Sequence, residues 1–188
     1  GEVRLLRHPS MIRPEEPGVQ VDRVLDCEIF SIDRLRVNLE GGREITRHIV
    51  RHPGAVVVVP QLDDGRLVMI RNLRVSVGSW LREFCAGKLE RGEDPALAAA
   101  RELEEETGYS ASEIRPLGTF YTSPGFADEL MHAFVARGLS PGERRLEVGE
   151  RIEVDLVPAT EVEDMLRDGR ICDGKTIAAF ALWRLAAP

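Results

Sequence analysis

The 188-residue sequence is poor in cysteine, in long apolar runs and in positive charge. Its three cysteines, Cys27, Cys85 and Cys172, are an odd number without a paired short spacing, which argues against a disulfide framework and a cysteine-rich zinc site. Its apolar runs, such as residues 55–60, fall far short of the roughly 18 residues that a membrane span needs. A net charge of −7 gives no general reason to bind nucleic acid or an anionic membrane, so we expect neither as a partner.

The overall composition is that of a globular protein. The chain is 43% hydrophobic and 30% charged, with no internal repeat or low-complexity tract, and its length suits one domain with at most a small appendage. The first ten residues are basic but lack the apolar segment of a secretory signal. Together with the cysteine usage, this predicts a cytoplasmic protein.

The first 52 residues differ in pattern from the rest. Residues 1–20 contain Pro9, Pro14 and Pro17 and are interpreted as an N-terminal arm. Residues 21–52 alternate in short runs around Gly41-Gly42, a pattern that predicts a small N-terminal antiparallel β subdomain. Residues 53–188 are expected to form the main domain.

The main domain mixes strands and helices without regular alternation. One helix has clear punctuation, with Asp94 as N-cap, Pro95 at its first position and Gly108 after its end. We therefore predict an α/β (α+β) sandwich with a mixed sheet. Strands are expected at 55–60, 66–72, 80–84, 130–136 and 152–158, a polar loop at 140–150, and further helices at 159–167 and 175–185.

A cluster of glutamates gives the main chemical signal. Glu102, Glu105 and Glu106 fall at i, i+3 and i+4 of the capped helix, so their side chains share one face, about 5–6 Å apart. These like charges repel one another, and a divalent cation would relieve the repulsion. Hard oxygen ligands favour Mg²⁺ or Mn²⁺ over zinc, and carboxylate-bound magnesium is a usual partner of phosphate groups. The alternative is a glutamate-rich surface that is only solvated.

The residues around this cluster follow a longer pattern. It runs through Gly87, Glu93, Arg101-Glu102-Leu103, Glu105-Glu106 and Gly108-Tyr109. These residues agree with G-x5-E-x7-R-E-U-x-E-E-x-G-U, in which U is apolar, and Tyr109 is slightly unusual in the last position. The pattern is the Nudix box, and the chain resembles the Nudix hydrolase superfamily. The resemblance implies a mixed sheet between helices and metal-dependent hydrolysis of a nucleoside diphosphate linked to another group.

The resemblance also implies roles for individual residues. It assigns the metal to the side chains of Glu102, Glu105 and Glu106 and to the backbone carbonyl of Ala86. It makes Glu93 and Arg101 the pair that braces the loop against the helix, and these two are counted with Glu105 among the catalytic residues.

Segments outside the box resemble the ADP-ribose pyrophosphatase subfamily. They include residues 52–56, 173–176 and 123–126, where Pro124 follows Gly108 by sixteen residues. This resemblance implies cleavage of ADP-ribose to AMP and ribose 5-phosphate with Mg²⁺, by a homodimer that exchanges its N-terminal β subdomain. GDP-mannose or another nucleoside diphosphate derivative is the alternative substrate. A non-catalytic Nudix module that senses a nucleotide is the alternative function.

Several residues outside the box are candidates for the reaction itself. In the subfamily a glutamate from the loop before the last strand acts as base or metal ligand, and Glu150 fits this place best, with Glu147 in reserve. Arg74, and after it Arg71, could bind the diphosphate bidentately, unless they only form surface ion pairs. Glu83 could bind substrate or metal, or pair with an arginine.

The remaining candidates are closer to ordinary structural residues. Pro124 is assigned to substrate binding through the subfamily spacing alone. Cys85, His132 and Trp183 are expected to pack in the core. Trp80 could stack on a base or fill the core.

Overall fold

The computed structural model describes residues 18–39, 41–146 and 149–186. Most of the predicted arm at 1–20 therefore lies outside the described residues, as does Glu147. No helix in the described part of the chain is both long and apolar enough to cross a membrane.

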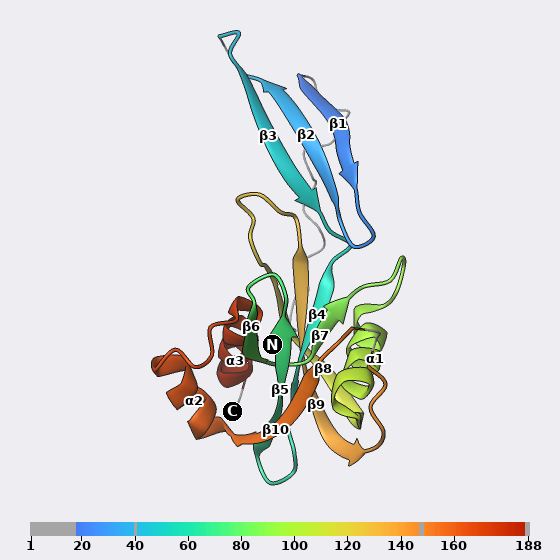
Figure 1. The fold of residues 1–188 in the computed structure, drawn as a ribbon, viewed down its shortest axis with the longest axis vertical. Coiled ribbons are helices and arrows are strands. Elements are labelled where there is room, and N and C mark those ends of the chain that lie inside the picture. Colours follow the sequence, from blue (N-terminus) through green and yellow to red (C-terminus); the bar gives the residue numbers. More distant parts are fainter. Residues whose placement is uncertain (1–17, 40, 147–148, 187–188) are drawn as a thin grey trace.

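An antiparallel sheet precedes the main body and projects from it (Figure 1). It consists of β1 (Val19–Asp26), β2 (Ser31–Asn38) and β3 (Glu44–Arg51) in the order β1-β2-β3. The predicted N-terminal antiparallel β structure is thus confirmed. Arg51 joins this sheet to the body, since its guanidinium bonds Asp33 of β2 and Asp128 of a body loop, each at 3.0 Å.

The body contains two further sheets. One has the order β7-β4-β9-β8, with β4 (Ala55–Pro60), β7 (Ala86–Lys88), β8 (Tyr109–Tyr121) and β9 (Leu130–Pro141). The other has the order β10-β5-β6, with β5 (Arg66–Arg74), β6 (Ser79–Glu83) and β10 (Ile152–Pro158). Strand β4 runs parallel to β9 and antiparallel to β7. The predicted mixed sheet is therefore confirmed.

Helices cover both faces of the four-stranded sheet (Figure 1). Val56 and Val58 of β4 pack under α1 (Pro95–Thr107), in a core that includes Leu103 and Cys85. Val57 and Val59 face the opposite core, which holds Trp183 of α3 (Gly174–Ala186) and buried residues of α2 (Ala159–Arg167). Alternate side chains of one fully buried strand thus face two separate cores, as expected for a strand covered on both sides. The packing roles predicted for Cys85 and Trp183 are confirmed.

Helix α1 begins and ends where its sequence predicts. The Asp94 carboxylate accepts a hydrogen bond from the backbone N–H of Ala96 at 2.8 Å. Gly108 adopts a left-handed φ of 77°, and its N–H donates to the carbonyl of Glu104. These caps satisfy backbone groups that a helix end leaves unpaired, and they fix the register of the glutamates between them.

Two sequence expectations need correction. Strand β9 continues to Pro141, through the start of the predicted polar loop, because Tyr109 and Ser110 of β8 pair with Pro141 and Ser140. Trp80 does not fill the core: it is 39% exposed, and the guanidinium of Arg71 lies 5.5 Å from its ring centre.

Candidate active site

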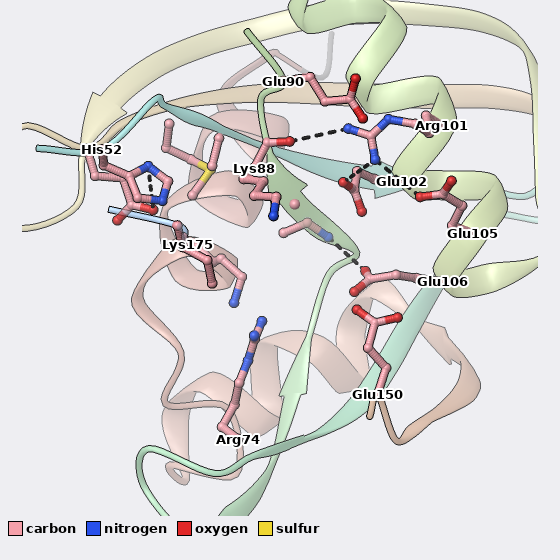
Figure 2. A pocket seen from close by; sticks show the side chains of 16 residues that line it. His52, Arg74, Lys88, Glu90, Arg101, Glu102, Glu105, Glu106, Glu150 and Lys175 are labelled. Atoms are coloured by element: carbon pink, nitrogen blue, oxygen red, sulfur yellow. Dashed lines mark hydrogen bonds and ion pairs between the residues drawn. The ribbon is translucent and has the colours of Figure 1, made fainter. Parts of the chain in front are cut away.

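A cleft of about 390 Å³ opens beside β7 and one face of α1. Figure 2 shows carboxylates of Glu102, Glu105, Glu106 and Glu150 along one side. Arg74 of β5 and Lys175 of α3 enter from another direction and point toward one another. Elements distant in sequence thus place an acidic wall and a cationic wall around one space.

The acidic wall comes chiefly from the inner face of α1. Glu102 and Glu106 are buried on this face, at 9% and 3% exposure. Burial raises the pKa of Glu102, and Arg101 offsets part of this effect. Burial also raises the pKa of Glu106 to about 8; the N–H of Ala86 opposes this shift, whereas the charges of Glu102 and Glu150 reinforce it.

Ala86 lies directly against the acidic wall. Its backbone N–H donates to Oε2 of Glu106 at 2.9 Å, so the start of β7 is tied to the last turn of α1. Gly87 follows, and a Cβ atom added there would overlap the carboxylate of Glu102. At this glycine the backbone therefore lies close to a buried side chain, which a Cβ atom would displace.

Arg101 braces the loop that precedes α1. Its guanidinium contacts both carboxylate oxygens of Glu93 at 3.1 Å and the carbonyl of Lys88 at 3.3 Å. This pairing is the main reason that the pKa of Glu93 is lowered. The bracing geometry expected for Arg101 and Glu93 is present in the structure.

Arg101 also occupies oxygen atoms of the acidic wall. It contacts Glu102 at 2.6 Å and Glu105 at 3.2 Å. In this arrangement the described residues include no group of three or more His, Cys, Asp or Glu side chains close enough to enclose a metal ion. The donors themselves suit a hard divalent cation, because they are carboxylates. Burial and mutual repulsion destabilise their negative charge, and a nearby cation would stabilise it.

Glu150 reaches the cleft from the segment before β10. Figure 2 shows its carboxylate pointing toward Glu106, and it lines the same cleft. The structure thus brings the predicted loop glutamate to the glutamates of the box.

The cationic wall contains a buried carboxylate that does not line the cleft. Arg74 contacts both oxygens of Glu83, at 2.8 and 2.6 Å, and Lys175 contacts the same carboxylate at 2.5 Å. Glu83 is 0% exposed. The pairing with an arginine, which the sequence left open for Glu83, is therefore the contact observed.

Other predicted residues lie away from the cleft lining. Arg71 pairs with Glu153 at 2.7 Å, and Pro124 is exposed on the loop between β8 and β9. Conversely, Lys175 lines the cleft although the sequence analysis did not select it as a site residue. Its place in the subfamily-like segment 173–176 was the available signal.

The mixed-sheet sandwich, the glutamate-bearing helix and its braced loop define a hydrolase of the Nudix type. The sequence matches the model of the NUDIX domain over residues 50–180. The chain therefore belongs to the Nudix family and is a Nudix hydrolase, a family whose members generally depend on a divalent metal ion.

Curated relatives match nearly the whole chain. A methanol dehydrogenase activator of Bacillus methanolicus is 40% identical, over 91% of this chain and 94% of its own length. An ADP-ribose pyrophosphatase of Bacillus subtilis (strain 168) is 38% identical, over 91% of this chain and 94% of its own. A GDP-mannose pyrophosphatase of Escherichia coli O1:K1 / APEC is 33% identical, over 83% and 88%.

A solved structure shares the fold. It is described as an ADP compounds hydrolase, and it superposes with a TM-score of 0.77 over 97% of this chain and 95% of its own, at 24% sequence identity. This likeness extends over the N-terminal sheet as well as the body.

Proposed function

We propose that the protein hydrolyses the diphosphate bond of ADP-ribose, releasing AMP and ribose 5-phosphate. The observation that carries this proposal is the opposition of the two walls of the cleft. Arg74 and Lys175 can donate N–H hydrogen bonds to a diphosphate, and the glutamates of α1 can hold the divalent cation that accompanies such a substrate.

The cation is proposed to be Mg²⁺, with Mn²⁺ as a substitute. It would be held by Glu102, Glu105, Glu106 and the carbonyl of Ala86. Binding would replace some of the contacts that Arg101 makes with Glu102 and Glu105. The cation supplies charge neutralisation on the phosphate oxygens. Arg101 and Glu93 keep the loop and helix in register around these ligands.

The role of proton acceptor is assigned to Glu150. Glu150 accepts a proton as the oxygen of a water molecule bonds to one phosphorus, and the bond from that phosphorus to the bridging oxygen breaks. Arg74 binds the diphosphate throughout this step. Arg71 and Pro124 lie outside the cleft lining. They would contact the substrate only if it extended beyond the cleft.

The choice of ADP-ribose is supported by the relative of 38% identity that bears this activity in its name. A GDP-mannose pyrophosphatase at 33% identity makes GDP-mannose the alternative substrate. Both substrates share the diphosphate and differ in base and sugar, so the proposed chemistry is common to both.

Turnover on a matched panel tests the proposal. ADP-ribose, GDP-mannose, UDP-glucose, NADH, diadenosine polyphosphates and dNTPs are incubated with enzyme and Mg²⁺, and phosphatase then releases phosphate from monoester products. We expect the highest kcat/KM for ADP-ribose, and its loss in Glu105→Gln. Preference for another member of the panel would overturn the substrate, and no turnover by folded protein would favour a nucleotide sensor.

We also propose that the protein is a cytoplasmic homodimer formed through the N-terminal sheet. Apolar side chains on this sheet and its turns are exposed, at 51% for Val24, 48% for Leu25 and 50% for Ile29. Ile29 also lines the cleft, so a partner here would lie close to the substrate. Light scattering after gel filtration should give twice the monomer mass, and a monomer at micromolar concentration would contradict the proposal.

The relative of 40% identity suggests a second function, activation of a methanol dehydrogenase. Addition of this protein to such a dehydrogenase, with and without Mg²⁺, tests it by the rate of alcohol oxidation. An unchanged rate would exclude this function for the dehydrogenase used.

A further inference from the structure

A chain of polar contacts lies behind the cationic wall and joins it to the start of α3. Lys175 contacts Glu83 at 2.5 Å and the carboxylate of Asp173 at 3.0 Å. Arg74 holds the other side of Glu83 through two hydrogen bonds. The two acidic and two basic side chains balance in charge, which is a condition for keeping a carboxylate as deeply buried as Glu83.

The position of Glu83 shows that it acts through its neighbours. It is 0% exposed, and both of its carboxylate oxygens accept hydrogen bonds from the two cations. Arg74 and Lys175 stand between it and the cleft, which they line and Glu83 does not. Glu83 therefore sets where the two cations sit.

Thr176 ties this group to the backbone next to the metal-binding segment. Its buried hydroxyl accepts from the N–H of Phe84 at 3.0 Å and donates to Asp173 at 2.6 Å. The N–H of Thr176 also donates to Asp173 at 3.0 Å. This hydroxyl thus links α3 to Phe84, which lies between Glu83 and Ala86 in the chain.

We propose that Thr176 and Asp173 are positioning residues for the diphosphate. Asp173 contacts Lys175 directly, and Thr176 holds Asp173. Lys175 and Arg74 in turn share the carboxylate of Glu83. This inference rests on the proposed function, because it takes the substrate of the cleft to be a diphosphate.

Replacement of the hydroxyl tests the inference. Thr176→Val keeps the shape of the side chain but removes the hydroxyl, so the hydrogen bonds of that hydroxyl with Phe84 and Asp173 are lost. The backbone N–H at position 176 still donates to Asp173. We expect KM for ADP-ribose to rise about tenfold, the size expected for loss of a hydrogen bond to a charged group. We expect kcat to stay within about threefold, because the cations hold the diphosphate alike in the ground state and the transition state. Thr176→Ser keeps the hydroxyl and should restore KM.

Two further measurements separate positioning from folding. The Kd of α,β-methylene-ADP-ribose, measured by calorimetry, should rise with KM in both Thr176→Val and Asp173→Asn. Ala181→Gly weakens the same helix at an exposed position, so it should lower Tm while KM stays within about twofold of wild type. A merely structural Thr176 would instead lower the amount of active enzyme and leave KM unchanged.

A double-mutant cycle gives the sharpest outcome. In a Lys175→Met background only the route to Arg74 through Phe84 and Glu83 remains, so Thr176→Val should raise KM by less than it does in the wild-type background. A full additional increase there, or an unchanged KM in the single variant, would overturn the inference. If the wild-type protein turns over no diphosphate substrate, the proposed function fails instead, and the two failures are distinct.

Discussion

The close approach of β7 to α1 makes Gly87→Ala an informative substitution. A Cβ atom at Gly87 would lie within 3.0 Å of all three atoms of the Glu102 carboxylate, closer than real Cβ contacts allow. Gly87 does not have a positive φ, so alanine fits the backbone there. The substitution therefore acts on one side chain, which must move by about 1 Å or more.

The expected loss follows from how Glu102 is held. It is 9% exposed and hydrogen-bonded to Arg101 at 2.6 Å, so a shift of its carboxylate would loosen this contact. A misplacement of about 1 Å in a catalytic group costs roughly 100-fold in rate. Stability should change little, since Gly→Ala at a permitted backbone position favours folding by about 0.4–1 kcal/mol and so offsets part of the clash.

The assay is kcat/KM for ADP-ribose across a Mg²⁺ titration, with Tm measured in parallel. We expect a loss of about 100-fold and a higher Mg²⁺ concentration at half-maximal rate. Leu97→Ala, on the exposed face of the same helix at 67% exposure, is the matched control and should retain its rate. Near wild-type turnover by Gly87→Ala would refute the assignment of Glu102 to the metal.

Three further outcomes are expected. Chelation with EDTA should abolish turnover, and added Mg²⁺ should restore it and stabilise the fold by about 2.7 kcal/mol at one hundred times its Kd; turnover that persists in EDTA would exclude a metal requirement. Glu106→Gln should lower kcat by at least about 100-fold, the scale of losing one electrostatic contact to the transition state, and an active variant would remove Glu106 from the site. Burial opposes a low pKa for Asp33, but hydrogen bonds from Arg23 and Arg51 prevail and lower it. Its carboxylate thus stabilises the fold above its unfolded pKa and stops doing so as the pH falls through the lowered value. Asp33→Asn should therefore cost about 1–2 kcal/mol near pH 7 and less below pH 3, as measured by urea unfolding; an equal cost at both pH values would contradict this assignment.

Local signals made α1 predictable from the sequence. Its N-cap, first-turn proline and terminal glycine act within a few residues of each helix end, and the structure has all three in place. The spacing of the glutamates then follows from helix geometry alone. The continuous apolar run of β4 was equally readable, because a strand buried on both faces shows no alternation.

Features that depend on distant partners could not be predicted in the same way. The extension of β9 to Pro141 exists because β8 continues beside it, and no residue of the polar segment indicates this. The short strand β7 pairs with β4 across thirty residues of chain. Lys175 reaches the cleft because α3 begins against the residues that join β6 to β7, where the buried Thr176 accepts a hydrogen bond from the N–H of Phe84.

The arrangement of charge explains why the site combines an arginine with so many glutamates. Arg101 shares its guanidinium among Glu93, Glu102 and Glu105, whereas Glu106 receives one hydrogen bond, from the N–H of Ala86. Glu106 is therefore the least compensated member, and burial with repulsion from its neighbours raises its pKa to about 8. Arg101 thus holds Glu102 and Glu105 together, whereas no cationic side chain contacts Glu106 among the described residues. A cation at this site would be held by Glu106 together with Glu102 and Glu105, whose oxygens Arg101 contacts in this structure.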